Sequence, residues 1–190
     1  MINEINTACE VMCGGGIILY PSDTTWGLGC DATNDTAVER VYSIKQRSEN
    51  HPLLAIAGSL EQLTEYVDMP PEPVLNFINA FVTPLTIVYP KARNLAHNLT
   101  AADGSIGIRL TNEPFMKTLC LEYGKPVVST SANISGWPAA SHFRYIHPDI
   151  KAAVDYAFQY RRNDCMFSYP LLPSSVIRIS DDAKTITVIR

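Results

Sequence analysis

Residues 16–46 read GIILYPSDTTWGLGCDATNDTAVERVYSIKQ, and this stretch decides the fold class. It opens on a short apolar run, Gly16 to Tyr20, whose length and composition are typical of a buried strand. It closes on residues 34–46, where apolar side chains recur at helical spacing on one face: Ala37, Val38, Val41 and Ile44. A strand that leads into an amphipathic helix indicates a fold in which strands and helices alternate.

The same alternation extends outward to both ends of the chain. Residues 3–13 keep a 3.6-residue period and end at three glycines, Gly14 to Gly16. Further helices are expected at residues 59–67, 71–81 and 112–123, and further strands at residues 53–57, 85–89, 106–110, 127–130, 156–160, 175–179 and 185–189. We therefore expect a single α/β (α+β) domain over residues 1–190, with one twisted mixed sheet flanked by helices.

Composition and charge exclude several classes of protein. No apolar run approaches the ~20 residues of a bilayer-spanning helix, and the first residues lack the basic character of a secretory signal. Neither the cysteines nor the histidines have metal-ligand spacing. The net charge of −4 argues against a dedicated nucleic-acid binder, although a local basic cleft is compatible with it. We expect a cytoplasmic protein with no membrane partner, no protein-held metal and buried or half-buried free thiols at Cys9, Cys13, Cys30, Cys120 and Cys165.

Two segments could bind a small polar ligand through hydroxyls and backbone N–H groups. Residues 20–29, YPSDTTWGLG, follow an apolar strand with a polar cluster and two glycines, which is typical of a ligand loop at a strand end. Residues 128–136, VSTSANISG, place four hydroxyls and an amide after another expected strand, where α/β sheets tend to bind ligands. For each segment the alternative is a turn whose hydroxyls only cap the local backbone.

Three cations stand at positions that fit anions. Lys45 and Arg47 stand at the end of the expected helix at residues 34–46, where they could clamp phosphates or simply complement the negative end of the helix dipole. Arg109 lies inside an apolar strand, where a guanidinium must either reach solvent or meet an anion. The sequence contains no GxxxxGK[ST], GxGxxG or GxSxG motif, so a nucleotide would need another phosphate cradle.

Taken in order, these four segments resemble the YrdC family of L-threonylcarbamoyladenylate synthases in its short, single-domain form. The family pattern runs YPT(D/E)TxYGLG, KxR, an arginine strand and (T/P)SANxSG. This chain has YPSDTTWGLG at 20–29, KQR at 45–47, IGIR at 106–109 and STSANISG at 129–136, and the resemblance spans residues 5–190. It implies one twisted α/β domain with a concave, positively lined groove.

The resemblance also implies an activity. Such a nucleotidyltransferase joins L-threonine, bicarbonate and ATP into L-threonylcarbamoyl-AMP, releases pyrophosphate, and takes Mg²⁺ carried on the nucleotide. The product would serve tRNA threonylcarbamoyladenosine modification at position 37, so tRNA or downstream transfer proteins are implied partners. The implied ATP site comprises Lys45, Arg47, Ser105, Ser131 and Asn133, with Lys45 and Arg47 catalytic; the implied threonine site comprises Thr24, Arg109 and Ser129.

Several positions depart from the family pattern. His51 and Ile56 stand where many members have asparagine and histidine, respectively. The tail has QYRR at 159–162 in place of Asp-Gly-Gly, which makes Arg161 and Arg162 candidates for additional nucleotide contacts.

Three alternative functions follow from the same features. One is a paralogue of the YciO type, with other or weak nucleotide activity. The second is a module that binds double-stranded RNA or tRNA without catalysis. The third is carbamoyl transfer of the hydrogenase-maturation kind, in which the domain is embedded in a much longer chain.

Overall fold

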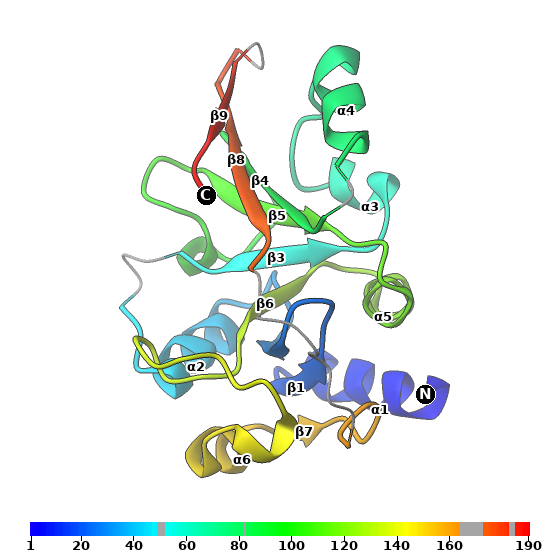
Figure 1. Cartoon of the computed structure of the whole chain (residues 1–190), viewed down its shortest axis with the longest axis vertical. Coiled ribbons are helices and arrows are strands. Elements are labelled where there is room, and N and C mark those ends of the chain that lie inside the picture. Colours follow the sequence, from blue (N-terminus) through cyan, green and yellow to red (C-terminus); the bar gives the residue numbers. More distant parts are fainter. Residues whose placement is uncertain (49–51, 82, 164–172, 183–184) are drawn as a thin grey trace.

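The fold is built on a mixed sheet, seen in a computed structural model that describes all residues except 49–51, 82, 164–172 and 183–184 (Figure 1). Its strands are β1 (Ile18–Pro21), β2 (Trp26–Gly29), β3 (Leu54–Ala57), β4 (Leu85–Tyr89), β5 (Ile106–Leu110), β6 (Val127–Ser131), β7 (Tyr156–Ala157), β8 (Ser175–Ile179) and β9 (Ile186–Val188). Within the described residues the order is β7-β1-β2-β6-β3-β5-β4-β8-β9. The pairs β1/β7, β3/β5 and β4/β8 are parallel, and the other neighbours are antiparallel.

Helices connect and cover these strands. They are α1 (Ile2–Cys13), α2 (Asp35–Lys45), α3 (Leu60–Thr64), α4 (Glu72–Asn79), α5 (Pro114–Tyr123) and α6 (Pro148–Ala153), with 3₁₀ turns η1 (His97–Leu99) and η2 (Phe143–Tyr145). Local chemistry sets several ends: Asn34 caps α2 by accepting from the Ala37 N–H at 3.0 Å. Gly124 ends α5 at φ 77°, a conformation that glycine adopts without steric cost. None of the described helices is long and apolar enough to cross a membrane.

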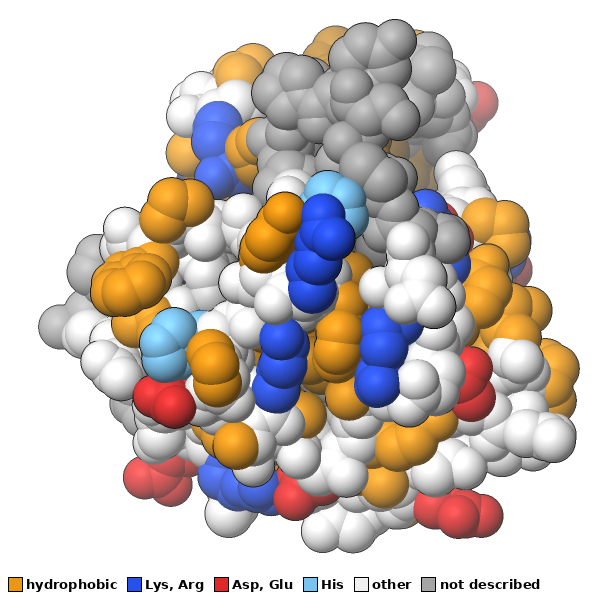
Figure 2. All heavy atoms as spheres, turned by 60° about the horizontal axis from the view of Figure 1, so that its bottom comes forward, with side chains coloured by type: hydrophobic (Ala, Val, Ile, Leu, Met, Phe, Trp, Pro, Cys, Tyr) orange, Lys and Arg blue, Asp and Glu red, His pale blue; other side chains and the backbone are white. Residues whose placement is uncertain are grey.

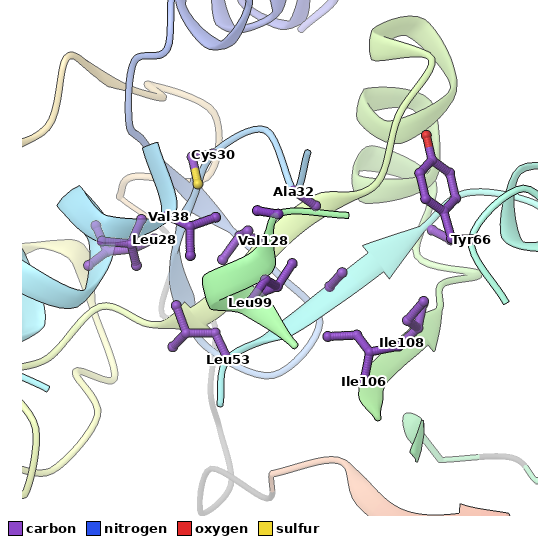
Figure 3. Packing of buried hydrophobic residues seen from close by; sticks show 14 of the residues in the cluster. Leu28, Cys30, Ala32, Val38, Leu53, Tyr66, Leu99, Ile106, Ile108 and Val128 are labelled. Atoms are coloured by element: carbon purple, nitrogen blue, oxygen red, sulfur yellow. The ribbon is translucent and has the colours of Figure 1, made fainter. Parts of the chain in front are cut away.

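The strands β1 and β2 are buried on both faces of the sheet because helices pack against each face there. Along β1, Ile18 and Tyr20 join one apolar cluster while Leu19 joins the other, as the two-residue period of a strand requires. Helices α1 and α5 cover the first cluster, and α2, η1 and α6 cover the second. Figure 3 shows part of the second cluster, where Val38 of α2 and Leu99 of η1 lie among Leu28, Leu53 and Val128.

The predicted α/β fold is confirmed, but residues 26–29 are a strand and not part of a loop. Gly27 pairs with Tyr20 across the β1–β2 hairpin. A Cβ atom at Gly27 would lie 2.8 Å from the Tyr20 ring, and one at Gly29 would lie 2.7 Å from the same ring. The two glycines therefore make room for a tyrosine and do not mark a turn.

Other expectations were wrong in detail. Residues 156–160 were expected as a strand, but only Tyr156 and Ala157 pair with β1. Helix α6 was not predicted at all. Among the predicted buried or half-buried thiols, Cys30 and Cys120 are buried and Cys9 is half-buried, but Cys13 is exposed at the end of α1. The prediction for Cys165 and the departure at His51 fall outside the described residues.

Candidate active site

A cavity of about 470 Å³ opens beside the β1–β2 hairpin and the strands β3, β5 and β6. The charged side chains on its described lining are all arginines: Arg47, Arg109 and Arg190. Much of the polar lining consists of hydroxyls: Ser22, Thr24, Thr25, Ser129, Thr130, Ser131 and Ser174. Cations combined with neutral hydroxyls fit an anionic polar ligand.

We call one group of residues the strand end: Thr24, Arg109 and Ser129 line the cavity, and Tyr20 supports Ser129 from behind through a hydrogen bond. The Ser22 hydroxyl shapes the hairpin loop that carries Thr24. It donates to the Thr25 carbonyl oxygen at 2.6 Å and accepts from the N–H groups of Thr24 and Thr25 at 3.2 Å each. This is the capped turn that the sequence offered as an alternative, and it presents Thr24 on the cavity wall.

Tyr20 and Ser129 connect the first and last of the predicted ligand segments. The Tyr20 hydroxyl donates to Ser129 Oγ at 2.7 Å. Tyr20 is fully buried, and burial raises the pKa of its hydroxyl, which therefore stays protonated as a donor. Because Ser129 Oγ accepts this bond, its own O–H is available to donate into the cavity that it lines.

Arg109 is buried on β5, with 4% of its surface exposed, and it meets an acid. Its Nη1 atom lies 3.0 Å from Asp23 Oδ1, in the loop of the β1–β2 hairpin. The expectation that this guanidinium either reaches solvent or meets an anion is thus resolved in favour of an anion. Since Arg109 also lines the cavity, it is placed to bind a ligand anion as well.

We call a second group of residues the loop end: Arg47 and Ser131 line the cavity, and Lys45 and Asn133 support them without lining it. The Lys45 ammonium is buried and donates to the carbonyl oxygens of Ser131 at 2.5 Å and Asn133 at 2.8 Å. It also donates to Asn133 Oδ1 at 3.5 Å. Burial, together with the nearby Arg47 charge, lowers the pKa of Lys45 to about 8.

The chain changes direction between the two cations. Gln46 caps α2 in the left-handed conformation, at φ 50°. Lys45 therefore points to the segment after β6, while Arg47 lies along the cavity wall and donates to the Pro52 carbonyl oxygen at 3.3 Å. The Asn133 side-chain amide donates to the Trp137 carbonyl oxygen at 2.5 Å, which holds the loop that follows β6.

Five of the eight predicted site residues lie on the cavity wall: Thr24, Arg47, Arg109, Ser129 and Ser131. Lys45 and Asn133 lie behind this wall and are hydrogen-bonded to each other. Ser105 does not line the cavity, because its hydroxyl donates to Asp103 Oδ1 at 2.6 Å in a local turn. The binding roles of all eight residues remain predictions.

Sequence reasoning missed two residues of the C-terminal segment, Ser174 and Arg190, which both line the cavity. An Arg190 guanidinium nitrogen donates to the Ser174 carbonyl oxygen at 3.3 Å. The tail cations proposed instead do not line it: Arg161 lies 3.8 Å from Glu113, and Arg162 stacks on Phe143. The Pro-Ser-Ser segment at 173–175 was the available signal for Ser174, but no local pattern marked Arg190.

Comparison with known proteins shows which family the chain belongs to. A family model described as telomere recombination, Sua5/YciO/YrdC, matches residues 10–190. The chain belongs to this family. A threonylcarbamoyl-AMP synthase from Pseudoalteromonas translucida (strain TAC 125) is 42% identical over 137 residues, which cover 70% of this chain and 73% of that relative.

Two solved structures of the Sua5/YciO/YrdC family have the same fold. Escherichia coli YciO superposes with a TM-score of 0.79 at 25% identity, over 100% of this chain and 89% of that one. Sua5 from P. abyssi, solved in complex with L-threonine, superposes with a TM-score of 0.83 at 24% identity over 98% of this chain. The chain spans about half of that Sua5 protein, 53% of its length.

Proposed function

We propose that this member of the Sua5/YciO/YrdC family is a threonylcarbamoyl-AMP synthase. It joins L-threonine, bicarbonate and ATP into L-threonylcarbamoyl-AMP and releases pyrophosphate. The observation that carries the proposal is the arginine- and hydroxyl-lined cavity, in a chain 42% identical to a curated protein of that name. ATP and bicarbonate are anions, and threonine carries a carboxylate. A lining of arginines and hydroxyls suits all three substrates.

The strand end is the proposed threonine site. Arg109 would bind the amino acid's carboxylate, and the Ser129 O–H, released toward the cavity by the Tyr20 bond, would donate to the same group. Thr24 on the hairpin loop would contact the remaining polar atoms of threonine. All three stand on or next to strands, so their positions vary little and favour one small ligand.

The loop end is the proposed nucleotide site. Arg47 and Arg190 would bind phosphate oxygens, and Ser131 would donate its hydroxyl to them. Lys45 and Asn133 would hold the loop in place and join the phosphate contacts when ATP displaces one of the loop carbonyls from the Lys45 ammonium. Ser105 stays a predicted ATP contact. Mg²⁺ would enter as part of the nucleotide substrate, since it usually binds phosphates with few protein ligands.

Formation of the mixed anhydride on the α-phosphate needs no protein nucleophile. The work of the site is to hold two anionic reactants in line and to neutralise the charge that develops as pyrophosphate leaves. In this proposal the cations of the loop end supply that neutralisation. We further propose that the domain spans residues 1–190, that it works in the cytoplasm, and that its product passes to tRNA through downstream transfer proteins.

The RNA-binding alternative has one observation in its favour. Arg144 lies 4.7 Å from the centre of the Tyr145 ring, and Lys151 and Arg162 lie 5.0 and 4.1 Å from the Phe143 ring. Figure 2 shows Lys and Arg side chains across the middle of the face that includes α6, with acidic groups mostly at its edge. Cations interleaved with aromatic rings bind single-stranded nucleic acid by charge and stacking, so this face would suit the single-stranded loops of a tRNA and not double-stranded RNA.

One assay separates the proposed synthase from a YciO-type activity and from an RNA-binding module. Purified protein is incubated with ATP, bicarbonate and Mg²⁺, with and without L-threonine, and pyrophosphate release is measured. Threonine-dependent release, much weaker with L-serine, is the expected result. Release without dependence on threonine would favour a YciO-type activity. No release from folded protein, together with salt-dependent binding of RNA, would favour the binding module.

A further inference from the structure

An acidic residue stands at the strand end without an assigned role. Asp23 lies between the cavity-lining residues Ser22 and Thr24, and no acidic side chain belongs to the described lining itself. Its Oδ1 atom is 3.0 Å from Arg109 Nη1. The Asp23 side chain is 20% exposed and that of Arg109 is 5% exposed, while the Asp23 Oδ1 atom itself is buried.

The pair leaves hydrogen-bonding capacity unused. Although Asp23 Oδ1 and Arg109 Nη1 are close enough for an ion pair, their alignment does not make a hydrogen bond, and Oδ1 has no hydrogen-bond partner among the described residues. The same holds for Arg109 Nε. Buried polar groups are normally satisfied, so an unsatisfied acceptor and an unsatisfied donor side by side indicate that a ligand supplies both partners.

The missing partners have opposite charge. A free α-amino acid carries an ammonium and a carboxylate on the same carbon atom, and it therefore needs an anionic and a cationic group close together. We infer that Asp23 binds the ammonium of the amino-acid substrate while Arg109 binds its carboxylate. This inference rests on the proposed function. It adds Asp23 as the residue that would distinguish an amino acid from a carboxylate without an ammonium.

The neutral oxygens nearby are already engaged. Ser129 Oγ accepts from the Tyr20 hydroxyl, and Ser22 Oγ accepts from two backbone N–H groups of the hairpin loop. Thr24 Oγ1 lies 3.2 Å from Ser22 Oγ. The Asp23 carboxylate is thus the acceptor best placed for an ammonium, and a charged acceptor binds a charged donor more strongly than a hydroxyl does.

A purely structural role for Asp23 makes a different prediction. If the carboxylate only neutralised Arg109, Asp23→Asn would leave a stronger positive site, and every carboxylate ligand, threonine included, would bind more tightly. If Asp23 binds the ammonium, the same change weakens threonine binding while it strengthens binding of a carboxylate that lacks an ammonium. The two ligands then respond in opposite directions.

The test uses calorimetric titration of the full chain with L-threonine and with (R)-3-hydroxybutyrate, which is threonine without its amino group. For Asp23→Asn we expect the Kd of threonine to rise at least about tenfold and the Kd of (R)-3-hydroxybutyrate to stay equal or fall, as expected when one charge-assisted contact is lost. Asp23→Glu keeps the charge, and its threonine Kd should lie closer to that of the wild type. Thermal unfolding of each variant checks the fold.

Three outcomes would overturn the inference. Tighter threonine binding by Asp23→Asn would leave Asp23 as a neutralising group only. Equal weakening of both ligands would mark a general disturbance of the site. If the variants do not fold, the wild type still decides, because equal affinity for threonine and (R)-3-hydroxybutyrate would mean that the ammonium is not recognised. Wild-type protein that binds threonine but releases no pyrophosphate would contradict the proposed function and leave the ammonium site standing.

Discussion

The two ends of the cavity are built in different ways. At the strand end, side chains stand on β1, β5 and β6 or in the tight loop between β1 and β2, and the Tyr20–Ser129 and Asp23–Arg109 contacts exist without a ligand. At the loop end, the side chains follow α2 or accompany the segment after β6. There the Lys45 ammonium is held by the carbonyl oxygen of Ser131, the last residue of β6, and by that of Asn133 in the loop that follows.

This difference bears on what each end can recognise. Side chains on paired strands have little freedom, so they suit one small ligand with a fixed set of polar atoms. A loop held by one buried lysine can exchange carbonyl oxygens for phosphate oxygens, which suits a larger and more charged ligand. The contrast predicts that changes at the strand end alter the requirement for threonine and that changes at the loop end alter the requirement for ATP.

The largest effect is expected from Lys45→Ala at the loop end. The change removes three hydrogen bonds, one to the end of β6 and two to Asn133 in the following loop, and one cation near the proposed nucleotide site, so turnover should fall at least about 10²-fold. Arg47→Ala should also lose most of its turnover while the fold survives. The measurement is steady-state pyrophosphate release, with the exposed Lys117→Ala as a matched control. Wild-type rates in either loop-end variant would contradict the assignment of the loop end as the nucleotide site.

The second largest effect, from Arg109→Ala at the strand end, should change the KM for threonine and not that for ATP. Arg109→Ala removes the proposed carboxylate partner, and the KM for threonine should rise by about 10- to 100-fold while the KM for ATP changes little. Arg178→Ala removes an exposed arginine paired with Asp103 and serves as the control. Equal increases in both KM values would mean that the strand end does not bind threonine on its own.

The third effect is a pH dependence confined to the loop end. The pKa of Lys45 is lowered from 10.5 to about 8, so the ammonium loses its proton as the pH rises through 8. We expect kcat/KM for ATP to fall by up to about tenfold per pH unit above 8, with threonine held saturating. A flat profile between pH 7 and 9.5 would show that the charge on Lys45 is not required.

The same shift has a consequence for stability. Because the folded pKa lies below the ordinary value, the unfolded chain binds more protons between pH 8 and 10.5. This group therefore increases the free energy of unfolding as the pH rises through that window, and its penalty is fully present below pH 8. Lys45→Met should abolish this contribution, which urea unfolding at pH 7.5 and 9.5 would measure.

The smallest effect is expected from Tyr20→Phe at the strand end. Loss of the hydroxyl leaves Ser129 free to rotate and removes one buried hydrogen bond, worth about 1 kcal/mol. The KM for threonine should rise by about two- to tenfold, with the KM for ATP unchanged. Tyr145→Phe, at an exposed tyrosine, is the matched control. A larger effect on ATP than on threonine would contradict the division of the cavity into two ends.

Local sequence features were sufficient for much of this protein. The apolar period of residues 34–46 predicted α2, because a helix buries one stripe whatever it packs against. Residue type singled out Arg109, since a cation inside an apolar strand needs an anionic partner. It left two roles open for Lys45 and Arg47 at the helix end, phosphate binding or interaction with the helix dipole. The order of four short segments then pointed to the family that the later comparison confirmed.

Tertiary structure decided what local patterns cannot encode. Gly27 reads as a turn residue until Tyr20 is seen to lie across it, and Ser105 reads as a site residue until its hydroxyl is seen on Asp103. Arg190 reaches the cavity because the end of the chain pairs with Val176 at the start of β8, through hydrogen bonds of 2.8 and 3.2 Å. Sequence determined the elements and their chemistry, because propensity and polarity act over a few residues. The meeting of groups far apart in the chain depended on how the sheet is paired, which no single segment specifies.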